Sequence, residues 1–217
     1  MKKLIQGLVD FRRHTLPAYR LTFAKLAKSQ NPDCLFIACS DSRVVPNLFA
    51  STNPGDLFVV RNVGNLVPTH ATASRDQSVS SALEFSVLAL GVYDIVVCGH
   101  SNCGAMKGLL GGQLPEGAST LGGWLSHGQS SLDRMAREPD SGDLPDYDRL
   151  SRANVLEQVD HLRSFPFVQQ RISDGKVRVH AWWFDVGSAD VYAHEPDLGW
   201  VLIDEEEGAR ILGEPVE

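Results

Sequence analysis

Short apolar runs bounded by polar, turn-forming residues recur along the chain and predict buried β-strands. Near-continuous hydrophobic runs are typical of strands that are covered on both faces of a parallel sheet. A further segment at 177–186 alternates in part and predicts another strand, and a turn at 187–190 predicts a return strand from Val191. The three apolar runs are CLFIAC at 34–39, LFVV at 57–60 and DIVVCGH at 94–100.

Helical periodicity appears before and between these strands. Leu83, Val87 and Leu90 fall on one face of a segment at 76–90, which is predicted to end at Gly91. Residues 1–29 are predicted to form a helical arm with a break at Pro17. The remaining predicted helices run from near Cys103 to Leu110 and over about 121–137, 148–164 and 167–173.

Strands that alternate with helices indicate an α/β fold. We expect a mostly parallel central sheet flanked by helices, with room for an antiparallel edge strand near the C-terminus. The length of 217 residues is sufficient for a hydrophobic core. The chain is interpreted as a single domain over 1–217, with an N-terminal helical arm at 1–29 and a C-terminal extension at 187–217. The acidic residues at 204–207 are predicted to be a solvated end.

The composition narrows the class of protein. With 43% hydrophobic and 22% charged residues, the chain has ordinary globular usage, which excludes disorder or a coiled coil throughout. Acidic residues outnumber basic ones by 27 to 20, and the net charge of −7 argues against nucleic acid or an anionic membrane as partner. No apolar run approaches the roughly 18 residues of a membrane span. The N-terminal residues do not resemble a secretory signal, so a cytoplasmic protein is expected.

The four cysteines are too few for a disulfide scaffold, and in a reducing compartment we expect them to be free, metal-bound or catalytic. Cys39 ends the first predicted strand, and His100 and Cys103 come at and just beyond the end of the third. The carboxyl ends of parallel strands open into a common crevice, so these three side chains can converge. Two thiolates and an imidazole suit Zn²⁺ and leave a fourth position open. The alternative is three unrelated residues, and the spacing alone does not decide between the two.

Asp41 and Arg43 follow Cys39 closely enough to reach the same place. A carboxylate there can be the fourth zinc ligand or accept a proton from a zinc-bound water, and a bidentate guanidinium can fix it. The alternative from local sequence is a helix N-cap formed by Ser40 or Asp41. On the local pattern alone the cap is favoured.

The sequence beyond this segment favours a role of Asp41 and Arg43 at a metal site over the helix cap. The two motifs Cys-x-Asp-x-Arg at 39–43 and His-x-x-Cys at 100–103 resemble those of the β-class carbonic anhydrases. Intervening segments are also similar to that family, and the resemblance covers about residues 20–110 well and 150–187 more loosely. These segments are PGDLF at 54–58, RNVGN at 61–65 and CGH at 98–100.

The resemblance implies reversible hydration of carbon dioxide to bicarbonate and a proton by zinc-bound hydroxide. It assigns one zinc ion (Zn²⁺) per chain to Cys39, His100 and Cys103, and pairs Asp41 with Arg43 beside the metal. Two thiolates cancel the charge of the metal, so its acidity is reduced and activity is expected to rise on the alkaline side of neutrality. The family also implies a homodimer or higher homo-oligomer, with N-terminal helices that embrace the neighbour and active sites at the subunit interface.

A substrate pocket is implied by the same resemblance. Phe58, Val63 and Phe85 match its apolar positions, Gln30 matches a polar position that faces the substrate, and Gly104 lies next to a metal ligand. A tyrosine is usual where Phe85 stands, so a hydroxyl is missing here. The alternative for the apolar residues is plain core, and for Gln30 a surface amide.

A regulatory bicarbonate pocket of some bacterial members uses Trp, Arg and Tyr. The matching positions here are Phe36, Arg61 and Phe184, so two of its three residues are replaced. Together with Gln30, this makes the sequence more similar to the plant and cyanobacterial group of the family.

Two other functions remain open at this level. The same fold and metal can support hydrolysis of COS or CS₂, which a different access tunnel would favour. A non-catalytic zinc-binding homologue would also keep the three metal ligands. The presence of Asp41 and Arg43 argues against the second of these, because a purely structural zinc site does not need them.

Overall fold

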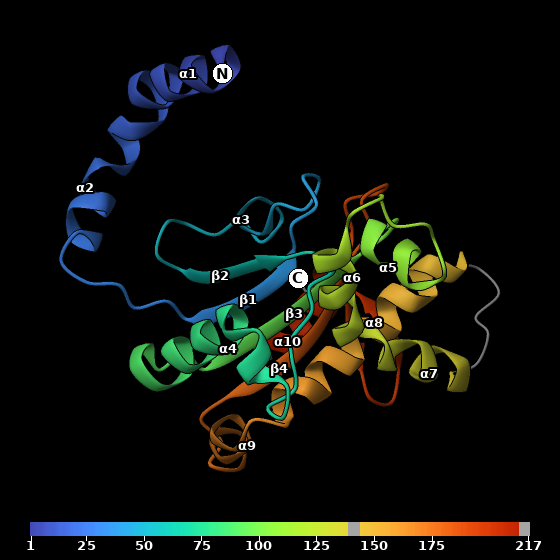
Figure 1. The fold of residues 1–217 in the computed structure, drawn as a ribbon. Helices are drawn as coiled ribbons and strands as arrows, with labels where there is room; N and C mark the ends of the chain where they lie inside the picture. The colour runs from blue at the N-terminus through green and yellow to red at the C-terminus, as the bar shows by residue number, and fades with distance from the viewer. Residues whose placement is uncertain (139–143, 213–217) are drawn as a thin grey trace.

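A computed structural model describes residues 1–138 and 144–212 of the chain. Its centre is a six-stranded sheet in the order β2-β1-β3-β4-β5-β6. Figure 1 labels the first four strands of this order. The first four strands in that order are parallel, and β5 and β6 add to the edge in antiparallel fashion. The strands are β1 Cys34–Cys39, β2 Leu57–Asn62, β3 Asp94–His100, β4 Arg178–Phe184, β5 Val191–Glu195 and β6 Gly199–Leu202.

Helices fill the connections between the four parallel strands. The N-terminal arm stands away from the sheet in Figure 1 and contains no buried residue in either α1 or α2. None of the helices in the described ranges is long and apolar enough to cross a bilayer. The helices are α1 Lys2–Asp10, α2 Leu16–Leu26, α3 Pro46–Phe49, α4 Gln77–Glu84, α5 Gly104–Leu109, α6 Ser119–Leu125, α7 Ser130–Arg137, α8 Asp146–Arg163, α9 Pro166–Ser173 and α10 Glu205–Leu212.

The main core lies between one face of the sheet and the helices α4, α8 and α9. Alternate residues of β1 and β3 point to this face, as the two-residue period of a strand requires. The opposite face packs a smaller group around Phe36 against α3 and aromatic residues of β4. The central residues of the main core are Leu35, Ile37, Ile95, Val97, Leu83, Val155, Leu162 and Val168.

The fold confirms the predicted mixed sheet, its antiparallel C-terminal edge and the helical arm, but several local predictions were wrong. The segment at 57–60 lies in β2, which is an edge strand with half-exposed residues because only β1 pairs with it. The helix expected over 121–137 is interrupted by a short 3₁₀ turn at Ser126–Gly128. Pro17 does not break the arm, since it occupies the first turn of α2, where its missing N–H costs nothing. A π-helical turn at Phe11–Thr15 precedes it.

The C-terminal extension contains more structure than the sequence indicates. Strand β6 was not predicted, and the acidic stretch at 204–207 leads into α10, where Asp204, Glu205 and Glu206 are exposed as expected. Glu207 is buried there and forms an ion pair with Arg210. Residues 213–217 of the predicted extension lie outside the described residues.

Because α8 packs closely on β3, we expect Gly99, near the end of β3, not to tolerate a larger side chain. A methyl group at Gly99 would lie 2.6 Å from Cγ2 of Val155 and 3.1 Å from Oγ of Ser151, both on α8. We expect Gly99→Ala to push α8 from the sheet and to lower the free energy of unfolding by about 1–3 kcal/mol. Urea unfolding measures this. The control is Gly123→Ala in α6, where a methyl group meets nothing within 4 Å. Equal stability of the two variants would contradict this packing.

Candidate metal centre

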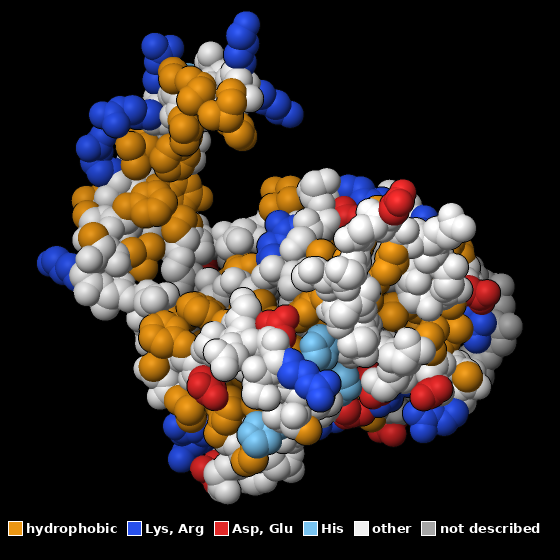
Figure 2. All heavy atoms as spheres, viewed as in Figure 1, with side chains coloured by type: hydrophobic (Ala, Val, Ile, Leu, Met, Phe, Trp, Pro, Cys, Tyr) orange, Lys and Arg blue, Asp and Glu red, His pale blue; other side chains and the backbone are white. Residues whose placement is uncertain are grey.

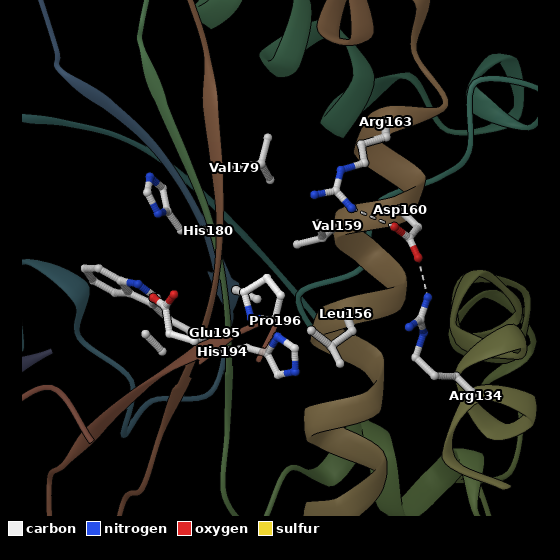
Figure 3. Close-up of a pocket in the computed structure, with 13 residues that line it drawn as sticks. Arg134, Leu156, Val159, Asp160, Arg163, Val179, His180, His194, Glu195 and Pro196 are labelled. Atoms are coloured by element: carbon white, nitrogen blue, oxygen red, sulfur yellow. Dashed lines mark hydrogen bonds and ion pairs between the residues drawn. The ribbon is translucent and has the colours of Figure 1, made fainter. Parts of the chain in front are cut away.

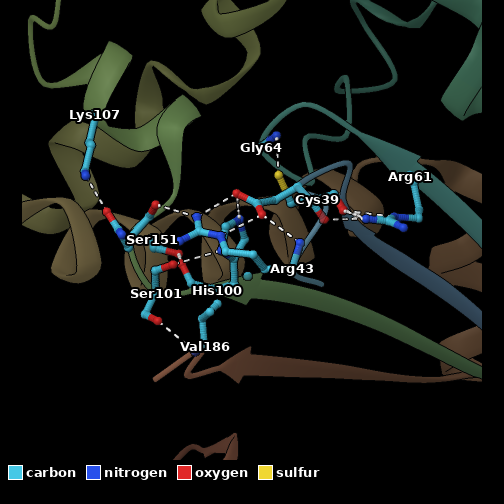
Figure 4. Close-up of polar contacts among 12 residues, drawn as sticks. Cys39, Arg43, Arg61, Gly64, His100, Ser101, Lys107, Ser151 and Val186 are labelled. Carbon is cyan, nitrogen blue, oxygen red and sulfur yellow. Dashed lines mark hydrogen bonds and ion pairs between the residues drawn. The ribbon is translucent and has the colours of Figure 1, made fainter. Parts of the chain in front are cut away.

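Three metal-ligating side chains meet at the carboxyl ends of two neighbouring parallel strands. β1 and β3 pair with Ala38 opposite Cys98, so Cys39 at the end of β1 lies beside the last residues of β3. His100 ends β3, and a tight turn brings Cys103 back to the same place. The two sulfur atoms and an imidazole nitrogen lie within 4.8 Å of one another. All three residues are buried, with 5%, 0% and 1% of their surfaces exposed in sequence order. Figure 4 shows Cys39 and His100 among their polar contacts.

The imidazole of His100 is oriented so that its Nε2 atom can bind a ligand. Its Nδ1 lies 2.9 Å from the carbonyl oxygen of Ser101, which places the ring proton on Nδ1 and leaves a lone pair on Nε2. Nε2 is buried and has no hydrogen-bond partner among the described residues. A buried polar atom without a partner is costly, and a hydrogen bond from the other ring nitrogen to a carbonyl oxygen is typical of histidines that bind metals.

The two thiols also fit a soft divalent metal. The Cys103 side chain lowers the pKa of Cys39 by hydrogen bonding, and His100 and the backbone N–H of Gly64 act in the same direction. The resulting thiolate and burial raise the pKa of Cys103. A bound cation would stabilise both side chains as thiolates. Two thiolates and one neutral imidazole are a donor set that zinc accepts.

Asp41 and Arg43 form a bidentate ion pair beside these donors. Arg43 Nε and Nη2 donate to the two carboxylate oxygens at 2.9 and 2.7 Å. Asp41 Oδ2 lies 4.0 Å from Nε2 of His100. The hydrogen bonds from Arg43 hold the pKa of Asp41 well below its usual range, so the carboxylate is ionised at neutral pH.

The helix-cap interpretation of this segment is wrong. The next helix, α3, begins at Pro46, and its N-cap is Val45. One oxygen of Asp41 accepts the backbone N–H of Arg43 at 3.0 Å, which closes a local turn and not a helix end.

Arg61 has a role at this site that the sequence did not reveal. It lies on β2 opposite Ala38 of β1. Its guanidinium donates to the carbonyl oxygen of Cys39 at 3.0 and 2.9 Å, and to that of Asp41 at 2.6 Å (Figure 4). Arg61 therefore fixes the backbone that carries both side chains. Only the register of two paired strands could indicate this contact.

The predicted pocket residues are only partly brought together in the single chain. The rings of Phe58 and Phe85 lie 5.9 Å apart between centroids. Val63 and Phe85 keep exposed side chains, and the Val63 carbonyl accepts a hydrogen bond from Trp124. Gly104 begins α5 directly after a metal-ligating residue. Gln30 is exposed in the connection between α2 and β1.

A cavity of about 440 Å³ lies elsewhere, between α8 and strands β4 and β5 (Figure 3). None of the metal-ligating residues lines it. On its helical side, Asp160 lies between Arg134 and Arg163 and forms an ion pair with each of them (Figure 3). The cavity therefore has no direct part in the metal chemistry.

Comparison with known proteins agrees with this geometry. The family model described as "Carbonic anhydrase" matches residues 34–191. A carbonic anhydrase of Synechococcus elongatus is 42% identical over 194 residues, which is 88% of this chain and 70% of the relative. The solved β-carbonic anhydrase CcaA shares 35% identity and a TM-score of 0.84, and the match covers 93% of this chain and 98% of that one. A tetrameric β-carbonic anhydrase of Sordaria macrospora has 27% identity and a TM-score of 0.75, with 88% and 95% covered.

A parallel α/β sheet with a Cys–His–Cys group at its strand ends defines a class of zinc-dependent enzyme. Within that class, the chain belongs to the β-carbonic anhydrase family, whose members use zinc and catalyse the hydration of carbon dioxide. The resemblance seen in the sequence is thereby confirmed. Neither a COS or CS₂ hydrolase nor a non-catalytic homologue is favoured by these relatives.

Two buried cysteines allow a matched test of the metal centre. Cys39→Ser should reduce bound zinc to a small fraction of the wild-type content, because a thiolate ligand is replaced by a hydroxyl that stays protonated. Cys98→Ser is the control, because Cys98 is equally buried in β3 but lies outside the donor group. Elemental analysis of the purified proteins measures zinc per chain. Full zinc content in Cys39→Ser would remove Cys39 from the ligand set.

Proposed function

We propose that Cys39, His100 and Cys103 hold one zinc ion per chain, and that this site carries out the carbonic anhydrase reaction of the family. The observation that carries the assignment is the buried donor group with an unpartnered Nε2 on His100. The ion pair of Asp41 and Arg43 directly beside it supports a catalytic site over a structural one.

When bound, zinc supplies an activated water near neutral pH as the nucleophile for carbon dioxide. Asp41 offers an ionised carboxylate oxygen next to the donors, either as a fourth ligand or as an acceptor for a proton. Arg43 holds that carboxylate in one orientation through two hydrogen bonds. Burial of the three donors keeps bulk water from competing at the reacting centre.

The substrate pocket is proposed to be formed by Gln30, Phe58, Val63, Phe85 and Gly104 only when two chains associate. The exposed ring of Phe85 against Phe58 provides an apolar surface suited to a neutral gas, and it lacks a cover in the single chain. An exposed apolar patch of this kind is typical of an interface.

A homo-oligomer follows from the same reasoning. Leu4, Leu8 and Leu21 of the arm are 66%, 65% and 77% exposed. Figure 2 shows hydrophobic side chains gathered along the arm, which has no core of its own to bury them. We expect the arm to pack on a neighbouring chain and produce a dimer or a higher assembly. The tetrameric relative from Sordaria macrospora supports this proposal.

A cytoplasmic location is also proposed. The four cysteines are free thiols in the structure, although two of them lie within reach of one another in the donor group. Thiols that must remain reduced to bind zinc suit a reducing compartment.

The proposed reaction is tested by stopped-flow hydration of carbon dioxide from about pH 6.5 to about pH 9, on protein whose zinc content is known. We expect zinc near one per chain and a rate that rises above neutral pH. Under the same conditions, Asp41→Ala should retain zinc and turn over at least tenfold more slowly. Zinc-loaded protein without hydration activity at any pH would refute the proposed function, and wild-type rates in Asp41→Ala would remove that residue from the mechanism.

The proposed assembly is tested by substitutions on α1. Leu8→Glu should lower the molar mass in sedimentation or light scattering, because it places a charge in the surface that the neighbour would cover. Gln6→Glu adds the same charge on the same helix at a polar, exposed position and is the control. A wild-type protein that sediments as a monomer, or a Leu8→Glu variant with wild-type mass, would contradict the role of the arm.

A further inference from the structure

The turn between His100 and Cys103 depends on a residue far away in the sequence. Asp148, in the first turn of α8, is 7% exposed. Its Oδ1 accepts the backbone N–H of Asn102 at 2.5 Å. This carboxylate therefore bonds to the middle of the turn that separates two metal ligands, although it is 46 positions from Asn102 along the chain.

Asn102 has a backbone conformation that requires support. Its φ of 57° lies in the left-handed region, which non-glycine residues adopt at a cost, although asparagine tolerates it better than most. The conformation turns the chain sharply enough for Cys103 to return toward His100. A buried acceptor for the Asn102 N–H stabilises that peptide in this conformation.

The other side of Asn102 connects to the ion pair at the site. Its carbonyl oxygen accepts Nη2 of Arg43 at 3.1 Å, and Arg43 in turn holds Asp41. Its side-chain oxygen accepts a hydrogen bond from Lys107. A change in the backbone orientation of Asn102 would therefore move Cys103. It would also move the carbonyl oxygen that binds the Arg43 guanidinium.

The same helix supports the turn at a second point. Ser151, three residues after Asp148 and thus on the same face of α8, donates to the carbonyl oxygen of His100 at 2.8 Å (Figure 4). The indole of Trp183 fixes Ser151 in turn, at 3.1 Å. Ser151 thus acts on His100, while Asp148 acts on Asn102 in the part of the turn that leads to Cys103.

We propose that Asp148 is a positioning residue of the metal centre, which holds Asn102 so that Cys103 and Arg43 are both placed correctly. Its hydrogen bond is to the backbone of Asn102, and it acts through that peptide and through the guanidinium that Asn102 anchors. The inference rests on the proposed zinc role of Cys103. Stabilisation of α8 alone does not account for the contact, because the Asp148 carboxylate accepts a hydrogen bond from the turn at Asn102, outside that helix.

The test compares Asp148→Ala, Asp148→Asn and Asp146→Ala. Asp148→Ala should lose about tenfold to a hundredfold in zinc affinity, measured by competition with a chelator, and a similar factor in kcat with a smaller change in KM. Asp148→Asn keeps an acceptor oxygen at the same place and should stay within about threefold of wild type. Asp146 lies in the same helical turn with its side chain 71% exposed, so Asp146→Ala controls for charge and helix stability.

Cobalt(II) in place of zinc gives a readout that stability alone does not change. The absorption bands of the cobalt protein should coincide in wild type, Asp148→Asn and Asp146→Ala, and should shift in Asp148→Ala. The proposal is overturned if Asp148→Ala keeps wild-type affinity and bands and merely unfolds more easily. It is also overturned if Asp148→Asn is as impaired as Asp148→Ala, because the charge and not the hydrogen bond would then be required.

A measurement on the unaltered protein covers the case in which Asp148→Ala fails to fold. The amide of Asn102 should exchange slowly with solvent in the zinc-loaded wild-type protein, despite the exposed side chain of Asn102. Fast exchange of that amide overturns the proposal. If the wild-type protein proves inactive toward carbon dioxide, the proposed function fails, while zinc affinity, cobalt bands and amide exchange still decide the role of Asp148.

Discussion

A buried imidazole nitrogen without a hydrogen-bond partner sets the constraint on which the site depends. Nε2 of His100 is buried, and the contact of Nδ1 with the Ser101 carbonyl fixes the ring so that its lone pair faces the two sulfurs. Such an atom is costly unless a ligand satisfies it. The neighbouring elements are consistent with this need, because β1 and β3 end side by side and Gly99 lets α8 approach the strand closely.

Hydrogen bonds connect the charged side chains of the site to the backbone that carries the metal ligands. Asp41 is kept ionised by Arg43, and Arg43 is also anchored on the backbone of the turn that leads to Cys103. Arg61 secures the backbone of Cys39 and Asp41 from the other neighbouring strand. The ligands and the ionised carboxylate are thus joined by hydrogen bonds. A displacement of one strand end would alter both the metal geometry and the local charge.

The N-terminal arm, the edge strand β2 and the ring of Phe85 are at least partly exposed in the single chain, unlike the metal centre. None of the residues of α1 and α2 is buried, and none of the residues of the edge strand β2 is buried either. Phe85 is exposed close to Phe58. Apolar side chains are thus exposed both on the arm and at Phe85, which is why we place the completed pocket at an interface between chains.

The sequence by itself determined the alternation of strands and helices, the ends of β1 and β3, and the Cys39, His100, Cys103, Asp41 and Arg43 motifs. These features are local, because an apolar run or a short motif is encoded within a few consecutive residues. Only the tertiary structure decided the exposure of β2, the interruption of the helix after Leu125, and the presence of β6 and α10. It also decided the contacts of Arg61 and Asp148 with the site. Those contacts join residues far apart along the chain, and such a pair leaves no periodic pattern from which its geometry can be predicted.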